Sequence, residues 1–288
     1  MDTGIGLPNA VPDTPGPVIT EWARRAEQDG FSTLGTIGRL VYPSYDELIA
    51  LTAAAAVTER IRLTTSVLLA PLEKNTALFA KQAASLDRLS GGRLVLGVGL
   101  GGREDDFAAS DVPMNRRGRI LDEQLDQLKQ IWRGDGLHGT GPIGPTPARP
   151  NGPELIVGGQ GEAGFRRAAR IGDGWIMGGG TPDMFAQASA AVDQAWQEAG
   201  REGRPRKLSL AYFALGPDAR QAADTYLKRY YAFTGPVADQ IAAGAAVSPD
   251  QVRGYAAAFE QAGCDELIFI PCSAETDQVG LLAEVLHG

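Results

Sequence analysis

Three glycines have the spacing of a dinucleotide-binding turn. Gly97, Gly99 and Gly102 follow a short apolar run and form the pattern G-x-G-x-x-G. In a nicotinamide dehydrogenase such a turn holds the pyrophosphate at a helix N-terminus. The fold of such a dehydrogenase also places an acidic residue at the end of a second strand, about 20 residues after the glycines. The acids found there, Asp122 and Glu123, fall within a helical pattern, so the glycines need another explanation.

Glycine also gathers after two later apolar runs. Backbone without a side chain can approach a ligand closely and adopt a positive φ. Free N–H groups at a helix N-terminus favour an anion such as phosphate. We therefore expect a ligand at the positions where three consecutive apolar runs end, with two adjacent glycine loops as the cradle for a phosphate. These positions are Gly99 and Gly101, then Gly158, Gly159, Gln160 and Gly161, then Gly178 and Gly179.

Two charged side chains are candidates for the reacting end of that ligand. Arg39 follows the second apolar run, and Glu104 follows the glycines of the fourth. For each, a solvated or helix-capping role is the alternative. Histidine, the commonest general base, occurs only as His138 in a loop and as His287 beside the last residue. If the protein is an enzyme, we expect it to work without a histidine.

Composition excludes several classes of partner. Cys264 and Cys272 are the only cysteines, too few for a zinc site or a disulfide framework, and no metal is expected. The formal net charge of -8, with no basic cluster, argues against a nucleic-acid partner. No apolar run approaches the roughly 18 residues of a membrane span, and the first residues lack an export signal. The sequence therefore predicts a cytoplasmic protein without a membrane or nucleic-acid partner.

Eight short apolar runs alternate with helical segments along the chain. The runs are continuous, as in parallel strands that are buried on both faces. Eight βα units in 288 residues predict an α/β fold, a (β/α)8 TIM barrel that forms one domain over residues 1–288. A doubly wound open sheet is the alternative, but no shift in composition marks a second domain. The expected strands are 4–7, 32–37, 61–69, 93–99, 154–159, 174–179, 207–215 and 266–271, with helices near 16–29, 45–58, 75–89, 116–133, 162–170, 182–200, 218–262 and 276–286.

The chemistry of such a barrel lies in the loops at the C-terminal ends of its strands. Arg39, Glu104 and the glycine positions all fall in loops that follow strands. The fold would therefore gather them at one face. The connection at 134–153 precedes a strand and is expected at the opposite face, together with His138.

Four stretches resemble the bacterial luciferase-like flavin-dependent oxidoreductases. They are RLVYPSYDELIALTAAAAVTERIRLTTSVLLAP, NTALFAKQAASLDRLSGGRLVLGVGLGGREDDF, GDGWIMGG and AGCDELIFIP. The segment A-K-Q-A-A-S-L-D-R-L-S-G-G-R-L-x-L-G-x-G is the most specific of these features. The resemblance runs from about residue 4 to residue 286. It implies a TIM-type barrel that binds FMN, or the 8-hydroxy-5-deazaflavin coenzyme F420, at its C-terminal face.

The resemblance also assigns positions around such a cofactor. The bond Ser66–Val67 matches a non-prolyl cis peptide that lies behind the isoalloxazine in several deazaflavin members. Gly99 and Gly101 match the loop beside the ring. Residues 158–161 and 178–179 match the loops that usually hold the phosphate. A homodimer is a further implication of the resemblance.

The chain departs from the family where a proton donor is expected. Members often carry an acidic residue or His in the loop after the second strand, where this chain has Gly38 and Arg39. Sugar-phosphate members that use the deazaflavin carry a glutamate in the fourth loop. The matching place here is near Gly102, with Glu104 two residues further on. Arg39 and Glu104 are therefore the candidate catalytic residues, and the acid/base group stays open.

The resemblance favours a monooxygenase that uses reduced FMN and O2 on a small organic substrate. The reduced flavin would come from solution or from a partner flavin reductase. The cofactor would carry the chemistry, while the protein orients it and keeps water out. Two alternatives stay open: an F420-dependent hydride-transfer enzyme that uses no O2, and a flavin-binding barrel without turnover.

Overall fold

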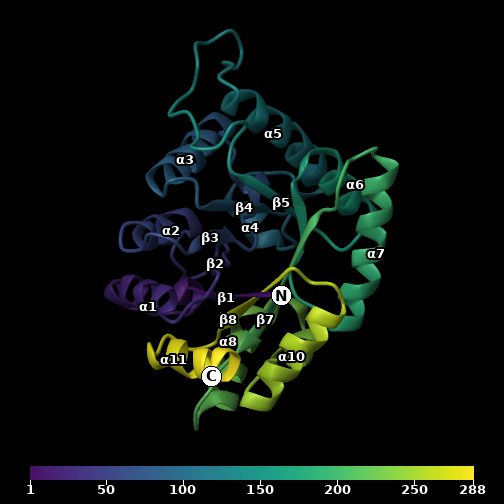
Figure 1. Ribbon diagram of the computed structural model, residues 1–288. Coiled ribbons are helices and arrows are strands. Elements are labelled where there is room, and N and C mark those ends of the chain that lie inside the picture. The colour runs from purple at the N-terminus through teal and green to yellow at the C-terminus, as the bar shows by residue number, and fades with distance from the viewer.

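Eight parallel strands close into a barrel in the order in which they occur along the chain (Figure 1). The computed structural model describes residues 1–288. The prediction of a single (β/α)8 TIM barrel is confirmed. The strands are β1 (Asp2–Gly6), β2 (Thr33–Thr36), β3 (Arg62–Thr65), β4 (Leu94–Val98), β5 (Glu154–Gly158), β6 (Gly174–Met177), β7 (Arg206–Phe213) and β8 (Glu266–Pro271).

Alternate residues of each strand face two separate apolar cores. In β4 all five residues are buried. Val95 belongs to a cluster inside the barrel with Ile156 and Ile268. Its neighbours Leu94 and Leu96 belong to the larger cluster between the barrel and its helices. Burial on both faces explains why the strands are continuous apolar runs in the sequence.

Helices surround the barrel and shield the outer faces of the strands (Figure 1). Side chains at the N-caps of several helices accept a backbone N–H, as Asp46 does from Ile49 and Asn75 from Leu78. Such a cap stabilises a helix by about 1 kcal/mol. The helices are α1 (Gly16–Gln28), α2 (Glu47–Ala55), α3 (Thr76–Leu89), α4 (Glu104–Ala109), α5 (Arg117–Trp132), α6 (Glu162–Ile171), α7 (Pro182–Glu198), α8 (Ala219–Tyr230), α9 (Val237–Ala243), α10 (Pro249–Gln261) and α11 (Asp277–His287).

One connection differs from the sequence-based expectation, and another follows it. The loop expected at 99–115 contains the short helix α4. The helices expected near 218–262 are α8, α9 and α10, with Gly235 at a φ of 60° after the turn of 3-10 helix Ala232–Thr234. Both insertions lie after strands, so they add structure to the face that is expected to carry the chemistry.

The connection at 134–153 does not stay at the face opposite the expected site. It folds back along α3, where Lys81 Nζ donates to the carbonyl of Gly144 at 2.8 Å. His138 of this connection lines a groove that also contains Lys74 and Asp111 from the loops after β3 and β4. The groove lies outside the barrel, between α3 and α5. His138 therefore borders that groove and makes no contact with the barrel interior.

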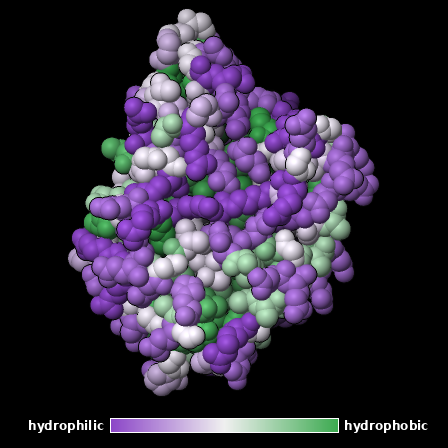
Figure 2. Space-filling model, in the orientation of Figure 1, coloured by the Kyte–Doolittle hydropathy of each residue, from purple (hydrophilic) through white to green (hydrophobic).

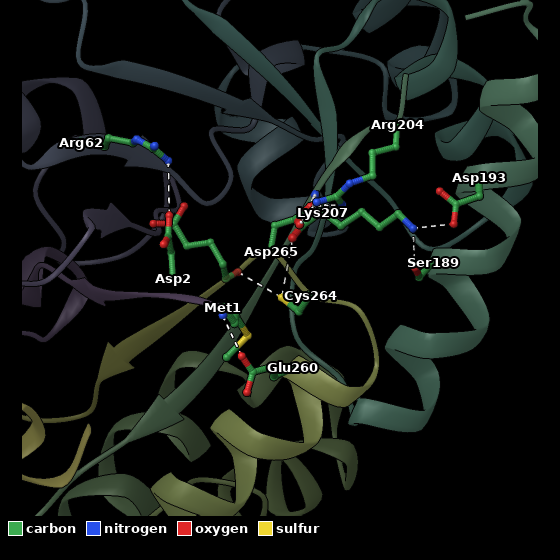
Figure 3. A network of polar contacts seen from close by, with 11 residues as sticks. Met1, Asp2, Arg62, Ser189, Asp193, Arg204, Lys207, Glu260, Cys264 and Asp265 are labelled. Atoms are coloured by element: carbon green, nitrogen blue, oxygen red, sulfur yellow. Dashed lines mark hydrogen bonds and ion pairs between the residues drawn. The ribbon is translucent and has the colours of Figure 1, made fainter. Parts of the chain in front are cut away.

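Charged side chains close the end of the barrel where the strands begin. Met1 lies near the viewer in Figure 1, and Figure 2 shows a largely hydrophilic surface over the middle of this end. In Figure 3 the N-terminal ammonium of Met1 contacts Glu260 at 2.8 Å. The ammonium of Lys207 reaches Asp193 at 2.6 Å and Ser189 at 2.8 Å. Each charge in this network has a partner.

A deeper ion pair lies next to that network. Arg206 of β7 pairs with Glu154 of β5 at 2.7 Å and with Glu266 of β8. The Glu266 side chain is fully buried and also accepts a hydrogen bond from Ser32. Three strands are therefore tied together at the base of the barrel.

No helix of the protein is long and apolar enough to span a lipid bilayer.

Candidate functional site

The loops that follow the strands converge at the opposite end of the barrel. The loop after β2 is joined to α4 by the backbone N–H of Val41, which donates to Asp106 at 2.7 Å. Asp106 has no exposed surface. The loops after β5 and β6 are joined by Gln160, whose Nε2 donates to the carbonyl of Gly179 at 2.8 Å. We refer to this end, from which Arg39, Glu104 and the glycine loops project, as the mouth of the barrel.

The bond between Ser66 and Val67 is a cis peptide, as the resemblance implies. Val67 lies against glycines of the two neighbouring strands and their ends. A Cβ atom added to Gly99 would lie 2.5 Å from Val67 Cγ2, and one added to Gly158 would lie 3.2 Å from Val67 Cγ1. Both glycines are buried. The structure thus gives Gly99 and Gly158 a packing role, which is to make room for Val67.

Other glycines of the mouth are open. A Cβ added to Gly161 or to Gly178 would meet no atom within 4 Å. Gly179 has a φ of 103°, a conformation that favours glycine. Gly161 is the N-cap residue of α6, and no side chain accepts the first N–H groups of that helix. These loops have the open backbone and the free N–H groups that fit a phosphate.

Gly101 has a third role. Its φ of 74° requires glycine, and a Cβ there would lie 3.2 Å from Leu69 and 3.5 Å from Phe107. Gly101 therefore lies in a turn after β4 that packs the loop after β3 against α4.

The motif glycines also differ from one another. A Cβ added to Gly97 would lie 2.0 Å from the carbonyl oxygen of Thr65, whereas one added to Gly102 would meet no atom within 4 Å. With Gly99 packed on Val67, the three motif glycines do not form one phosphate-binding turn.

Arg39 lies among aromatic rings at the mouth. Its guanidinium carbon is 4.5 Å from the ring centroid of Tyr42, 4.8 Å from that of Tyr230 and 5.7 Å from that of Phe233. It donates hydrogen bonds to the carbonyls of Tyr230 and Val41. No carboxylate forms an ion pair with it, and its Nε is buried without a hydrogen-bond partner. Burial and the neighbouring Arg103 lower the pKa of Arg39.

Arg103 and Glu104 have opposite environments. Arg103 is buried, contacts Asp105 and Asp106, and lies 4.5 Å below the ring of Phe233. Glu104 is exposed in the first turn of α4 and forms no hydrogen bond or ion pair through its side chain. The structure brings Arg39 and Arg103 together under Phe233 and leaves Glu104 outside this group.

Tyrosine side chains line the mouth on the side of β7 and α8. The hydroxyls of Tyr212 and Tyr231 are 2.6 Å apart, and the ring of Tyr230 packs against those of Tyr226 and Tyr231. Burial raises the pKa of each of these phenols, so they stay protonated at neutral pH. They provide an apolar wall with hydroxyl groups that can donate hydrogen bonds.

Several buried polar atoms around the mouth lack a partner. Buried polar groups are almost always hydrogen-bonded, so unpartnered ones at a cleft indicate a ligand. Besides Arg39 Nε, these atoms are Ser66 Oγ, Thr36 Oγ1, Tyr42 Oη and Tyr226 Oη. The residues present therefore fit a polar aromatic cofactor such as a flavin.

The structure contains an acid at the mouth that the sequence analysis missed. Glu47 begins α2, and its carboxyl lies against Gly38, where an added Cβ would overlap it. Burial raises the pKa of Glu47 to about 8. In the sequence, Glu47 follows the capping residue Asp46 and has the pattern of an ordinary acid in a first helical turn. Only the close contact of its carboxyl with Gly38, in the loop after β2, distinguishes Glu47 from such an ordinary acid.

Comparison with known proteins agrees with this geometry. The model of the luciferase-like monooxygenase family matches residues 4–266. An uncharacterized protein of Mycobacterium tuberculosis is 35% identical over 173 residues, which are 57% of this chain and 61% of that protein. The match thus spans about three fifths of that relative's length. The FMNH2-dependent dimethylsulfone monooxygenase of Pseudomonas putida is 27% identical over 65% of this chain and 53% of its own.

Solved structures share the fold at low sequence identity. An F420-dependent secondary alcohol dehydrogenase superposes with a TM-score of 0.82 at 19% identity, over 99% of this chain and 98% of its own. The monooxygenase RslO1 of Streptomyces bottropensis gives a TM-score of 0.77 at 22% identity, over the same shares. These likenesses establish the barrel architecture and leave the choice of cofactor open.

Proposed function

The chain belongs to the luciferase-like monooxygenase family, and from this premise we propose that it uses reduced FMN and O2 to oxygenate a small organic substrate. The observation that carries the proposal is the mouth of the barrel. It combines open glycine loops, an arginine without a carboxylate partner and several unpartnered buried polar atoms. No histidine lies at the mouth, which agrees with chemistry that a cofactor performs.

Specific residues would hold the cofactor. The free N–H groups at Gly161 and the open backbone at Gly178 would receive the phosphate. Ser66 and Val67 would lie behind the ring, with Ser66 Oγ free to hydrogen-bond to it. The bound reduced FMN supplies the electrons that activate O2. The tyrosine wall would exclude water from the reacting atoms.

Hydride transfer with reduced F420 is the second candidate. It is supported by the F420-dependent secondary alcohol dehydrogenase among the structures of the same fold. A 5,10-methylenetetrahydromethanopterin reductase of Methanolobus tindarius is also 27% identical over 74% of this chain and 65% of its own. A flavin-binding barrel without turnover is the third outcome that the experiment below must separate.

Anaerobic titration of the apo-protein with each reduced cofactor tests the proposal. We expect reduced FMN to bind and to quench protein fluorescence. Admission of O2 with a substrate should then oxidise the flavin and give an oxygenated product. Tight binding of reduced F420 without binding of FMN would overturn the proposal in favour of the second candidate. Binding of FMN without turnover would favour the third.

A phosphate-specific variant sharpens the same titration. Gly178→Asp places a carboxylate at an open position, so we expect FMN affinity to fall at least tenfold, about 1.4 kcal/mol. The affinity for riboflavin, which lacks the phosphate, should stay within about twofold. Gly254→Asp, at an equally open position in α10, is the matched control. Equal losses for FMN and riboflavin would contradict the phosphate assignment.

Assembly and partners follow as further proposals. A homodimer is supported by exposed apolar side chains on neighbouring helices, with Ile49 on α2 64% exposed and Leu78 on α3 50% exposed. A flavin reductase would supply the reduced FMN, and the cytoplasm, where reduced flavin is produced, would be the site of action. Light scattering during gel filtration distinguishes the dimer from a monomer.

A further inference from the structure

Glu47 is an acid at the mouth with no cation beside it. Its carboxyl fills the space that a side chain on Gly38 would occupy. Burial raises the pKa of the group to about 8, so it is uncharged at neutral pH. No hydrogen bond or ion pair joins it to another side chain. A partly buried carboxyl that bears a proton and has no side-chain partner has a proton that is free to move.

The surroundings of Glu47 explain why it stays protonated. It borders a cavity of about 200 Å³ that is lined by Leu68, Leu69 and Leu72 and continues from the loop that follows the Ser66–Val67 bond. The charged groups that face it are Asp46, Glu73 and Asp106, all acids, and the protonated Tyr230 lies nearby. Arg39 lines the same cavity, but its guanidinium is directed onto the rings of Tyr42 and Tyr230.

We infer that Glu47 is the proton donor of the site, acting from the cavity beside Gly38 on the oxygen atom that gains electrons during the reaction. The inference rests on the proposed function, because the reduced cofactor provides those electrons. In oxygenation the acceptor is the oxygen atom that leaves as water, and in hydride transfer it is the carbonyl oxygen. The O–H bond of Glu47 breaks, its electron pair stays on the carboxylate, and a new O–H bond forms on the acceptor.

The proton must then be replaced. The cavity is large enough for several water molecules and is continuous with the exposed loop at Leu40. A water molecule that enters there can return a proton to the carboxylate. Glu73 lines the same cavity, and burial and the nearby Asp46 raise the pKa of its carboxyl. It can relay the proton through that water.

A measurement on the apo-protein tests the protonation state without any turnover. Infrared difference spectra of wild type minus Glu47→Gln report the C=O stretch of this single carboxyl as a function of pH. We expect the protonated band at pH 7 and its loss as the pH rises through about 8. A Glu47 that is already ionised at pH 6 would overturn the inference by itself.

Kinetic measurements on the protein with bound reduced cofactor test the role of Glu47 as a proton donor. Glu47→Gln should keep the affinity for the reduced cofactor within about twofold and lower the rate of the chemical step by about 10²- to 10⁴-fold. Glu47→Asp should recover part of that rate. The exposed Glu284→Gln on α11 is the matched control and should leave both quantities unchanged.

Gly38→Ala reaches the same carboxyl without removing it. The added methyl group would overlap the end of the flexible Glu47 side chain, which must move away. We expect the rate of Gly38→Ala to fall with that of Glu47→Gln, while Gly254→Ala behaves as the wild type. Because this variant retains a glutamate in α2, it also covers the case in which Glu47→Gln fails to fold.

The outcomes separate the two proposals. If the wild type binds neither reduced FMN nor reduced F420, the proposed function fails and the inference fails with it. If a cofactor binds and both Glu47→Gln and Gly38→Ala turn over at the wild-type rate, the inference alone is overturned. A rate loss in both variants with unchanged cofactor affinity supports it.

Discussion

The two ends of the barrel differ in how their charged side chains are paired. At the end where the strands begin, Arg206 pairs with the fully buried Glu266, and Lys207 reaches Asp193. At the mouth, Arg39 has no carboxylate partner and Glu47 has no cation. The base thus pairs every charge of its network. The mouth leaves Arg39 and Glu47 without an opposite charge, although Arg103 there pairs with Asp105 and Asp106.

This difference separates stability from function. Paired groups at the base tie neighbouring strands together. Unpaired groups at the mouth cost stability, because a buried polar atom without a hydrogen bond loses its solvation. Such groups are found where a bound ligand supplies the missing hydrogen bond or charge. Perturbed pKa values cluster at such sites for the same reason. Changes at the base should therefore alter folding, and changes at the mouth should alter binding and catalysis.

The largest effect is expected at the base. Arg206→Met leaves Glu266 buried without its partner, so the free energy of unfolding should fall by about 3–5 kcal/mol. Urea denaturation measures the loss, and cofactor affinity of the folded fraction should not change. Arg204→Ala is the control, since Arg204 is 69% exposed and its pair with Asp265 is worth less than about 1 kcal/mol. Equal losses of unfolding free energy in the two variants would contradict the view that the buried pair at the base stabilises the fold more than an exposed pair does.

A pH-dependent effect of intermediate size is expected at the mouth. The pKa of Glu47 is about 8 in the folded protein, against a usual 4.5. Between those values the folded state holds a proton that the unfolded chain releases, so stability falls as the pH rises from about 4.5 to about 8 and is then level. The full shift corresponds to at most about 5 kcal/mol, and roughly half is expected because the carboxyl borders a solvent-accessible cavity.

Glu47→Gln removes this titration. Its free energy of unfolding should therefore exceed that of the wild type by about 2–3 kcal/mol at pH 9, with no gain at pH 4. Urea denaturation at both pH values, with Glu284→Gln as the control, measures the difference. A stability difference that is the same at both pH values would show that Glu47 is ordinarily ionised.

The smallest effect is expected where packing meets the mouth. Gly99→Ala pushes a methyl group against Val67 and should destabilise the protein by about 1–3 kcal/mol. Adding Val67→Ala makes room for this methyl group. The double variant should therefore lose less stability than the sum of the losses in the two single variants. Thermal unfolding of the four proteins in this cycle measures the coupling. Strict additivity would show that Gly99 and Val67 do not pack against each other.

The fold could be predicted from local patterns, because each strand of a closed parallel barrel is buried on both faces and is therefore a continuous apolar run. The site could be predicted only in part. The glycines mark the correct strand ends, but only the structure distinguishes Gly99, which packs on Val67, from Gly178, which is open. The position of Glu104 in the fourth loop predicts a catalytic acid, but the side chain is exposed. The environment of Glu47 depends on a loop nine positions earlier, and no local pattern records that contact.

The position of Phe233 bears on how quickly a ligand can enter and leave the mouth. Its side chain lies over both Arg39 and Arg103 and is 48% exposed. It extends from the short turn of 3-10 helix after α8, a segment held to the barrel by few buried residues. A molecule that stacks on the guanidinium face that Phe233 covers must first displace this ring. Where such stacking is part of binding, exchange of the bound molecule can be no faster than the movement of this turn.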